Sequence, residues 1–581
     1  MAVGRIEIGP GVTDNFPMTS PLTSVALDVV DPADDFPGPI YHSRVGGQLI
    51  RGASGERPVL SPATGAAFAR VSLLDAQQLS AAVGTAYAAF PAWSALSIHQ
   101  RVRHLRHLSD ALLEGAEEMA QLIAREQGKP VAEAHAVEIF PALESLKYLT
   151  RHAPDVLRDE PVDSEVLLLA HKNCRVRREP YGAMLVIAPW NYPLAIPLPA
   201  VAASLIAGNT VVLKPAPATT LIALRLADLA ERAGLPPGVL NVVAVADSLA
   251  EELVRDPRFG KIVFTGSTAT ARKVMATAAL RVTPLVLELG GKDPAIVCRD
   301  ADLDRAVPGI VWGAFVNAGQ TCASVERVYV EEPIAKEFIQ RVIAETRRLR
   351  MGDPSTDDVE IGPMTLERQR LIVEDHVADA CERGAQVETG GERPDRPGFY
   401  YPPTVLTGVT HEMKIMREET FGPVLPIQVV ASVDEALRLA NDSDYGLTAS
   451  VWTRDPMIAS HLECELQAGV VTVNDALYAY GDPSAPFGGY KLSGIGRAHG
   501  AAGLHEMVQI KYISRDWRRR PMLWWFPYDR GLRVLLETAH HALYSPSLLR
   551  RLTKQTRLMG ARRFLRRVSP FEVLRNIDRL F

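Results

Sequence analysis

Cys322 is the residue of this sequence with the clearest capacity for nucleophilic chemistry. It stands in the run Gly319-Gln320-Thr321-Cys322-Ala323-Ser324, after an apolar segment, residues 308–317, that we expect to be helical. Pro308 stands where a helix can begin, and Gly319 lies just past the expected end. A lone cysteine is usually a buried small hydrophobe, but a thiolate held at a loop edge can attack an electrophilic carbon. The turn therefore marks Cys322 as a candidate nucleophile.

Four further glycine- and proline-marked runs accompany this turn, and each alone could be an ordinary turn. They are Pro189-Trp190-Asn191-Tyr192-Pro193, Leu287-Glu288-Leu289-Gly290-Gly291-Lys292, Glu418-Glu419-Thr420-Phe421-Gly422-Pro423 and Pro486-Phe487-Gly488-Gly489-Tyr490-Lys491. Together, in this order, the five runs resemble the aldehyde dehydrogenase superfamily, from about residue 45 to about residue 514.

The resemblance implies a covalent route from an aldehyde to a carboxylic acid. A Cys322 thiolate would add to the carbonyl, giving a thiohemiacetal alkoxide that can expel a hydride toward a nicotinamide. The amide of Asn191 and the N–H of Cys322 would stabilise the oxyanion. Glu288 would deprotonate the water that hydrolyses the thioester. The presence of Glu288 also argues against a relative that passes the acyl group to coenzyme A. Considered singly, Asn191 would be a turn residue and Glu288 a solvated strand end.

The same resemblance implies dinucleotide contacts at Trp190, Lys214, Ser267, Glu419 and Phe421. Lys214 would bind the adenosine ribose, Ser267 the pyrophosphate, and Glu419 the nicotinamide ribose, with Phe421 packed beside the nicotinamide. Solvated charges and core packing are the alternatives for these side chains. The sequence Lys214-Pro-Ala-Pro217 has no carboxylate that would repel a 2′-phosphate, so NAD and NADP both stay open, with NAD slightly favoured.

The expected substrate channel is lined by Tyr192, Thr321 and Phe487. The neighbouring positions are small or neutral, without a cation that would anchor an anionic substrate. This favours an uncharged, aliphatic aldehyde. Two alternatives stay open: a semialdehyde dehydrogenase, and a non-catalytic scaffold that keeps the fold.

The elements that must position these residues follow a β-α-β-α order from Tyr181 onward. Apolar runs at residues 184–188, 210–214, 239–245 and 261–264 alternate with helical patterns at 198–207 and 220–233. Such runs are typical of parallel strands covered on both faces, and ligands bind at the carboxyl edge of such sheets. Asn191, Lys214 and Ser267 should therefore share one edge.

We predict an α/β protein with a parallel-sheet dinucleotide-binding domain, an α/β catalytic domain, a β-flap for oligomerisation and a helical tail. The expected ranges are an N-terminal extension at 1–44, the dinucleotide-binding domain at 45–158 and 182–287, the flap at 159–181 and 503–514, the catalytic domain at 288–484, a return segment at 485–502, and the tail at 515–581. Within the flap, residues 165–170 and 174–178 should form a hairpin, with a late strand at 504–513. Catalytic-domain strands are expected at 295–297, 327–330, 424–430, 450–452 and 469–473.

Composition indicates a cytoplasmic, multidomain protein. A chain of 581 residues is too long for a single hydrophobic core, and 47% of its residues are hydrophobic. We find neither an apolar run long enough to span a bilayer nor a secretory leader in the sequence. Five widely spaced cysteines without a CxxC pair suggest neither disulfides nor a metal site. As in the family it resembles, the protein should form a homodimer or homotetramer.

The tail is electrostatically separate from the rest of the chain. Residues 515–581 hold sixteen Lys/Arg against five Asp/Glu, although the whole chain carries a net charge of −5. A Trp-Phe-Pro-Tyr run at 525–528 is similar to one branch of the superfamily, and basic amphipathic helices are expected after Ser545-Pro546 and Ser569-Pro570. The tail could dock on the acidic body, on a partner subunit, or peripherally on a membrane. Nucleic acid is not an expected partner, because no recognised binding motif accompanies the charge.

Overall fold

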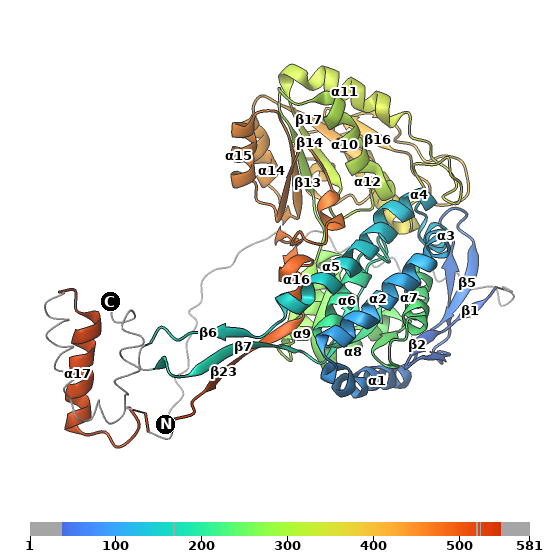
Figure 1. Cartoon of the computed structure of the whole chain (residues 1–581). Coiled ribbons are helices and arrows are strands. Elements are labelled where there is room, and N and C mark those ends of the chain that lie inside the picture. The colour runs from blue at the N-terminus through green and yellow to red at the C-terminus, as the bar shows by residue number, and fades with distance from the viewer. Residues whose placement is uncertain (1–37, 167–168, 519–520, 523, 548–581) are drawn as a thin grey trace, which may run out of the picture.

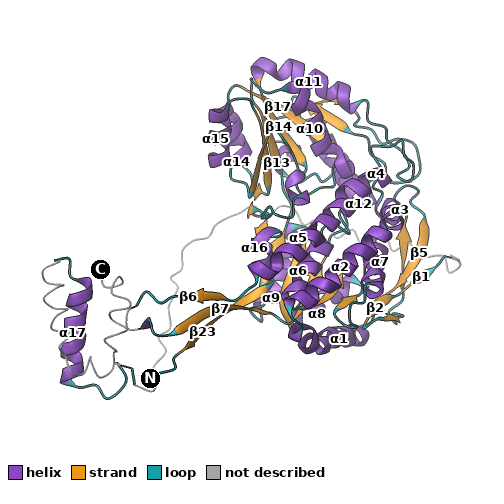
Figure 2. Cartoon of the chain, in the orientation of Figure 1, coloured by secondary structure: helices purple, strands orange, loops and turns teal. Residues whose placement is uncertain are grey.

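Two α/β lobes and an antiparallel arm make up the chain (Figure 1). The computed structural model describes residues 38–166, 169–518, 521–522 and 524–547. One lobe is built on an eight-stranded sheet and the other on a seven-stranded sheet, each covered by helices (Figure 2). The predicted fold class is confirmed.

The eight-stranded sheet has the order β22-β12-β11-β8-β9-β10-β2-β3, with its central five strands parallel. Its strands are β2 (Ser43–Val45), β3 (Gln48–Ile50), β8 (Ala183–Ile187), β9 (Thr210–Lys214), β10 (Leu240–Val242), β11 (Phe259–Thr265), β12 (Leu285–Glu288) and β22 (Gly494–Ile495). The predicted strands at 184–188, 210–214 and 261–264 are present, while β10 is shorter than the predicted 239–245. β2 begins two residues before residue 45, and β12 ends one residue beyond residue 287; the domain ranges stay predictions.

Alternating side chains bury both faces of this sheet. Along β8, Met184 and Val186 pack into one core, while Ala183 and Leu185 pack into the core on the opposite face. The first core includes α2 (Ile98–Glu114), α3 (Ala116–Gln127), α5 (Phe140–Val156), α6 (Pro197–Ala207) and α7 (Thr220–Arg232). The second includes α1 (Ala76–Ala95), α8 (Ala250–Arg255) and α9 (Thr268–Ala279). Gly208 ends α6 with φ of 103°, in the left-handed region where glycine is preferred.

The seven-stranded sheet has the order β15-β16-β17-β14-β13-β19-β20, and only the edge strand β15 is antiparallel to its neighbour. Its strands are β13 (Asp293–Val297), β14 (Val325–Glu331), β15 (Gln386–Thr389), β16 (Thr404–Thr407), β17 (Val424–Val430), β19 (Thr448–Trp452) and β20 (Val470–Val473). The helices of this lobe are α10 (Leu303–Phe315), α11 (Glu332–Thr346), α12 (Glu367–Glu382), α13 (Lys414–Arg417), α14 (Val433–Asn441) and α15 (Pro456–Glu465). All five strands predicted in this region are present.

The helix before Cys322 begins earlier than the sequence predicts. α10 starts at Leu303, and Pro308 lies inside it rather than at its first turn. The reason is the cap: the side chain of Asp302 accepts the N–H of Asp304 at 3.1 Å and so satisfies a free donor of the first turn. After α10, a tight turn spans Val316–Gly319.

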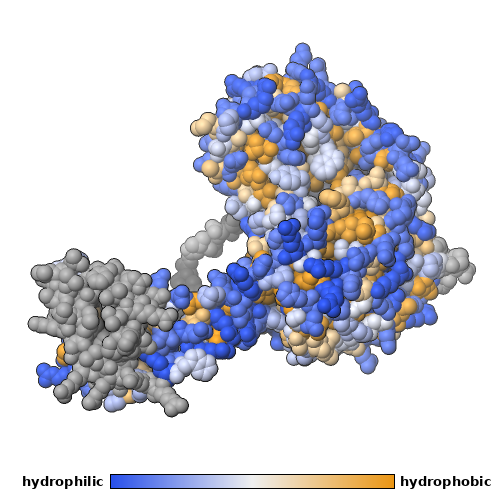
Figure 3. Space-filling view, viewed as in Figure 1, coloured by the Kyte–Doolittle hydropathy of each residue, from blue (hydrophilic) through white to orange (hydrophobic). Residues whose placement is uncertain are grey.

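The arm is a three-stranded antiparallel sheet of order β23-β7-β6, comprising β6 (Glu160–Val162), β7 (Asn173–Pro180) and β23 (Val508–Arg515). The described part of the predicted hairpin strand at 165–170, residues 165–166 and 169–170, is not in a strand, so this prediction is wrong there. The chain pairs through the short Glu-Pro-Val run of β6, where a proline is tolerated because the strand lies at an edge. The predicted late strand begins only at Val508, because residues 500–506 form α16 (Gly500–Glu506). Figure 3 shows apolar as well as hydrophilic surface on the arm, and Ile510 and Tyr512 are exposed there.

Smaller elements complete the described chain. They are the sheet of β1 (Ile40–Tyr41), β4 (Glu56–Leu60) and β5 (Ala67–Ser72), the pair β18 (Tyr445–Gly446) and β21 (Tyr490–Lys491), and α4 (Val131–Ala134). Within the predicted helical tail, the helix α17 (Arg530–Tyr544) lies beyond the far end of the arm, away from both lobes (Figure 1). α17 therefore does not dock on the body of its own chain. The tail helices predicted after Ser545-Pro546 and Ser569-Pro570 lie outside the described residues. No helix within the described ranges combines the length and hydropathy needed to cross a bilayer.

Candidate active site

The candidate site lies where the carboxyl edge of the eight-stranded sheet meets the turn that carries Cys322. Ile187, Lys214, Phe264 and Leu287 are in register across β8, β9, β11 and β12. The loops that follow these strands carry Asn191 and Ser267, and Glu288 ends β12. The predicted common edge for Asn191, Lys214 and Ser267 is therefore present.

Cys322 is positioned by an unusual backbone turn. Asn317, Ala318 and Gly319 have φ of 58°, 51° and 71°, three successive left-handed residues between α10 and the thiol. The seven-stranded lobe resumes at Val325, the first residue of β14, so the turn lies at the amino edge of that strand. The thiol is half-buried and belongs to the part of the chain between the two sheets.

Glycines let the backbone of neighbouring segments touch this turn. A Cβ on Gly291 would lie 2.6 Å from the carbonyl oxygen of Cys322, and one on Gly319 would lie 2.2 Å from that of Gly422. Both distances are too short for real contacts, so only glycine fits at either position.

Asn191 is held directly against the same turn. Its Nδ2 donates to the carbonyl oxygen of Gln320 at 2.9 Å, two residues before Cys322. The backbone carbonyl of Asn191 accepts from Asn317 Nδ2 at 2.9 Å and from Lys129 Nζ at 3.3 Å. Asn191 is buried, so both its side chain and its backbone are fixed relative to the thiol.

A buried ion pair that sequence reasoning missed supports this loop. Lys129 Nζ lies 2.6 Å from Glu138 Oε1, and both side chains are fully buried. Glu138 Oε2 accepts the N–H groups of Leu194 and Ala195 at 3.1 and 2.7 Å. The ammonium also lies 3.9 Å from the ring centroid of Tyr192. The chain carries no sequence signal for this pair, because a lysine and a glutamate nine residues apart are usually both solvated.

Two predicted channel residues are joined to each other. Tyr192 Oη and Thr321 Oγ1 are 2.8 Å apart, which ties the Asn191 loop to the residue before Cys322. Phe487 is buried in one apolar cluster with Ala323 and Leu447, and this cluster packs against Cys322. Val470, Leu477 and Tyr480 complete the cluster, and Tyr480 meets Phe487 edge-on at 4.9 Å. The surroundings of the thiol are apolar.

The surroundings of Cys322 favour the neutral thiol over the thiolate. Burial raises the pKa of this thiol above the ordinary range, and the carboxylates of Asp293, Glu419 and Glu288 raise it further. A negative thiolate is disfavoured in such surroundings, so the nucleophile requires a base or a positive charge close by when it reacts.

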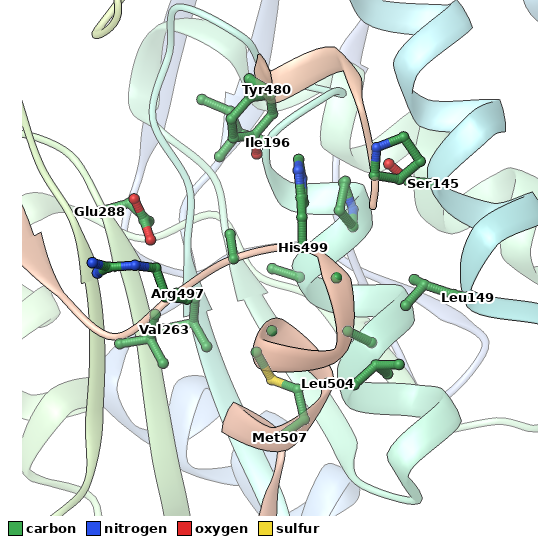
Figure 4. A pocket seen from close by; sticks show the side chains of 18 of the residues that line it. Ser145, Leu149, Ile196, Val263, Glu288, Tyr480, Arg497, His499, Leu504 and Met507 are labelled. Carbon is green, nitrogen blue, oxygen red and sulfur yellow. The ribbon is translucent and has the colours of Figure 1, made fainter. Parts of the chain in front are cut away.

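Glu288 is a buried carboxyl group near the charge of Arg497 and the backbone N–H of Ala498. It is 7% exposed, and within the described chain neither of its carboxylate oxygens has a hydrogen-bond partner. Burial raises its pKa well above the ordinary value, and the charge of Arg497 opposes this shift only in part. Figure 4 shows its carboxyl group at the side of a pocket that also contains Arg497 and His499. A raised pKa is the property that a general base near neutral pH requires.

The predicted dinucleotide contacts line the same edge. Lys214 is buried at the end of β9 with its Nζ 3.8 Å from Asp247 Oδ1; burial lowers its pKa and Asp247 opposes that shift. Ser267 caps α9, where its Oγ accepts the N–H of Thr270 at 3.3 Å. The N-terminus of this twelve-residue helix favours an anion.

The remaining predicted dinucleotide contacts are Glu419, Phe421 and Trp190. Glu419 Oε1 accepts the N–H of Gly291 at 3.2 Å, and a Cβ on Gly290 would lie 2.3 Å from the same oxygen. Burial, and then the neighbouring Glu326, raise the pKa of Glu419 to about 8. The rings of Trp190 and Phe421 meet edge-on at 5.4 Å.

Another missed residue, Glu326, fixes the backbone of the Glu419 segment. Its carboxylate accepts the N–H groups of Thr420 and Phe421, both at 2.8 Å, and pairs with Lys292 Nζ at 2.7 Å. Phe421 has φ of 51°, a conformation that this contact helps to hold.

A dinucleotide fits this set of side chains. The buried ammonium of Lys214 suits the adenosine ribose, and the N-terminus of α9 at Ser267 suits the pyrophosphate. The carboxylate of Glu419, which has one backbone partner, suits the nicotinamide ribose. Within the described ranges, no group of three His, Cys, Asp or Glu side chains is placed to bind a metal ion.

The sheet order and the residues at its carboxyl edge define an α/β protein of the dinucleotide-binding type. Residues 49–513 match the aldehyde dehydrogenase family, and the chain belongs to this family. It is therefore an oxidoreductase that acts on aldehydes. The match ends before residue 515, so the resemblance of the tail to the Trp-Phe-Pro-Tyr branch stays a prediction.

Named relatives cover most of the same range. The chain is 39% identical to 4,4'-diapolycopene aldehyde oxidase of Methylomonas sp over 75% of this chain and 82% of the relative. It is 36% identical to succinate-semialdehyde dehydrogenase [NADP(+)] GabD of Escherichia coli (strain K12), over 81% and 96%. The crystal structure of lactaldehyde dehydrogenase from Escherichia coli superposes with a TM-score of 0.79 at 35% identity, covering 82% of this chain and 99% of that chain.

Proposed function

We propose that this protein oxidises an uncharged aldehyde to a carboxylic acid, with Cys322 as nucleophile, Asn191 as oxyanion donor and Glu288 as general base. The observation that carries this assignment is the contact of the Asn191 amide with the Gln320 carbonyl, which fixes an N–H donor beside the thiol. A donor held before reaction costs no reorganisation when charge develops.

The reaction begins when the Cys322 thiol loses its proton to a base or to water, and the resulting thiolate adds to the aldehyde carbonyl carbon. The oxygen that becomes negative accepts hydrogen bonds from Asn191 Nδ2 and from the backbone N–H of Cys322. A bound nicotinamide dinucleotide supplies the acceptor for the hydride that leaves this carbon. The product is a thioester on Cys322. Water then attacks the thioester carbon while Glu288 takes its proton, the C–S bond breaks, and the acid is released.

Lys214, Ser267, Glu419, Trp190 and Phe421 are the residues that would hold the dinucleotide. The relative from Escherichia coli is named for NADP(+). In this chain, Lys214 and the neighbouring Arg57 place two cations at the adenosine end, with the carboxyl groups of Asp247 and Glu126 also near Arg57. These cations support use of NADP as well as NAD, although the sequence alone favours NAD slightly.

The substrate is proposed to be an uncharged, apolar aldehyde. The clusters beside the thiol contain Tyr192, Ile196, Phe487 and other apolar side chains, and the lysine that contacts Tyr192, Lys129, is already paired with Glu138. The Methylomonas relative, named for a diapolycopene aldehyde, is consistent with this class. The second candidate is a semialdehyde, which the name of the Escherichia coli relative favours.

The test is turnover of purified protein with NAD and NADP against aliphatic aldehydes of rising length and succinic semialdehyde, followed by absorbance of the reduced cofactor. We expect kcat/KM to rise with chain length and Cys322→Ala to lose turnover. Unchanged turnover in Cys322→Ala would contradict the mechanism. Turnover with succinic semialdehyde alone would replace the substrate assignment with the second candidate.

We also propose that the arm joins two copies of the chain into a homodimer, or two dimers into a homotetramer. β23 is an edge strand with one unpaired side and exposed Ile510 and Tyr512. For residues 515–581 we propose attachment to a partner subunit or to an anionic membrane surface. Trp525, Phe526 and Tyr528 are exposed just before α17, which supports an attachment role. A cytoplasmic location stays a prediction.

A further inference from the structure

A second hollow adjoins the site without containing Cys322. It has a volume of about 580 Å³, its open mouth included, and lies among α5, α6, α16 and the ends of β11 and β12. Most of its lining is apolar, including Val263, Leu504 and Met507 (Figure 4). Its titratable side chains are Tyr148, Glu288, Tyr480, Arg497 and His499. Neither Cys322 nor Phe487 lines it, so this hollow, the base pocket, differs from the apolar surroundings of the thiol.

The base pocket holds two buried groups whose polar atoms are unused. Glu288 has two carboxylate oxygens, and His499 two ring nitrogens, for which the described chain offers no hydrogen-bond partner. His499 is 9% exposed. Buried polar atoms are normally satisfied, and a bound water can satisfy them where it has two or more polar partners. Glu288 and His499 are such partners on the wall of an otherwise mostly apolar hollow.

The backbone at His499 is strained. Its φ is 62° and its ψ is 171°, a backbone conformation that residues other than glycine rarely adopt. His499 occupies the cap position of α16, yet its side chain does not cap the helix. Its ring packs on Tyr480, with centroids 4.5 Å apart, so the imidazole is held over the pocket instead. Strain of this kind is found where a side chain must be placed for function.

We propose that His499 relays the proton that Glu288 takes from the hydrolytic water, passing it through the base pocket to solvent. This inference rests on the proposed role of Glu288 as general base. His499 touches neither the substrate nor Cys322, so it acts through Glu288.

The proton balance of the relay is simple. In thioester hydrolysis the water oxygen bonds to the acyl carbon, the sulfur leaves, and one water proton moves to Glu288. The protonated carboxyl group must lose this proton before the next cycle. One ring nitrogen of His499 accepts it through water, and the other releases a proton outward, so the imidazole ends neutral.

The surroundings suit a neutral imidazole that is briefly charged. Burial lowers the pKa of His499 to about 4, while the carboxylate of Asp482 opposes the shift. The positive charge of Arg497 disfavours a second positive charge on His499. Arg497 Nη1 donates to the carbonyl oxygen of Gly496, 2.7 Å away. Asp482, Pro483 and Tyr148 are half-buried, which sets the solvent side of the path next to His499.

The experiment compares His499→Gly and His499→Gln with the exposed histidine of the same helix, His505→Gln. Glycine accepts the φ of position 499, so His499→Gly is expected to fold. Rapid-mixing traces with a saturating aldehyde and NAD or NADP should show a full first turnover of reduced cofactor. The later steady rate should be lower by about tenfold or more, because thioester hydrolysis stalls. Free imidazole should restore that rate, whereas pyrrole, which fills space without accepting a proton, should not. His505→Gln should match the unmodified protein.

Several outcomes would overturn the relay. A wild-type steady rate in folded His499→Gln or His499→Gly would do so. An equal loss of the first turnover and the steady rate in these variants would also overturn the relay. So would restoration of the steady rate by pyrrole as well as by imidazole. Failure of the proposed function itself looks different, because the unmodified protein would then form no reduced cofactor with any aldehyde.

Discussion

The side-chain amide of Asn191 is bonded to the carbonyl oxygen of Gln320, 2.9 Å away, so a loop of one lobe is fixed to the reactive turn of the other. Asn191→Ala removes the proposed oxyanion donor and one of the two hydrogen bonds to the buried Gln320 carbonyl, which keeps its bond from Asn317 Nδ2. We expect kcat to fall by about 10²–10³-fold. Stability should fall by about 0.5–1.5 kcal/mol, the value of one hydrogen bond. Steady-state kinetics and thermal unfolding measure the two effects, and a kcat within a few-fold of the unmodified enzyme would remove Asn191 from the mechanism.

Breaking the Lys129–Glu138 pair should damage folding and turnover together. Lys129→Met leaves Glu138 buried without its counter-ion, which costs about 3–5 kcal/mol. The double variant Lys129→Met with Glu138→Gln should recover most of that stability, because a glutamine oxygen still accepts from the N–H groups of Leu194 and Ala195. Denaturant unfolding of both variants is the measurement. Equal stability of the single and double variants would mean that the pair is not coupled.

Glu288→Gln should change the dependence of stability on pH. The folded pKa of Glu288 is raised above the unfolded value of about 4.3, so the folded state holds its proton longer. The contribution of Glu288 to stability is therefore lost as pH rises above about 4.3 toward the folded pKa. Each unit of raised pKa corresponds to about 1.4 kcal/mol. The stability of the glutamine variant relative to the unmodified protein should rise between pH 5 and pH 8; a constant difference would refute this.

Cofactor preference should respond to a carboxylate placed after Lys214. Pro217→Glu puts a negative charge three residues beyond the lysine proposed to hold the adenosine ribose, where it would repel a 2′-phosphate. We expect kcat/KM with NADP to fall about tenfold relative to NAD, which equals about 1.4 kcal/mol. Pro217→Ala controls for loss of the proline. A parallel loss with both cofactors would place the 2′-position elsewhere.

Removal of the tail should separate attachment from chemistry. A chain ending at Arg515 keeps all of β23, whose last residue pairs with Asn173. We expect unchanged kcat/KM with a soluble aldehyde, and loss of binding to anionic vesicles or a smaller assembly in sedimentation. Loss of turnover in a folded truncation would contradict the attachment role, as would unchanged assembly together with unchanged vesicle binding.

Sequence patterns predict the sheets of this protein better than its irregular segments. Buried parallel strands such as β9 and β17 are continuous apolar runs, so residues 210–214 and 424–430 were predicted with their observed bounds. β6 was missed because a three-residue edge strand with a proline has no apolar pattern. The start of α10 was predicted at Pro308, but the cap formed by Asp302 makes the helix begin at Leu303.

The motifs also predict which residues meet between the two lobes, but they do not predict the buried residues that support them. Glu138, Glu326 and Asn317 act through contacts between segments far apart in the chain, and such contacts leave no local pattern. His499 was missed for a related reason. A lone histidine before a short helix has no distinguishing neighbours, and its importance comes from a strained φ and a shared hollow.

The three glycines around Cys322 also determine where this enzyme tolerates redesign. At positions 290, 291 and 319, any added carbon would collide with Glu419, with the backbone of Cys322 or with that of Gly422. A library that varies these positions would consist mostly of misfolded chains. Variation at Ile196, Leu447 and Leu477 changes side chains around the thiol without moving that backbone. Altered aldehyde preference is therefore accessible through a small set of apolar positions while the reactive turn stays intact.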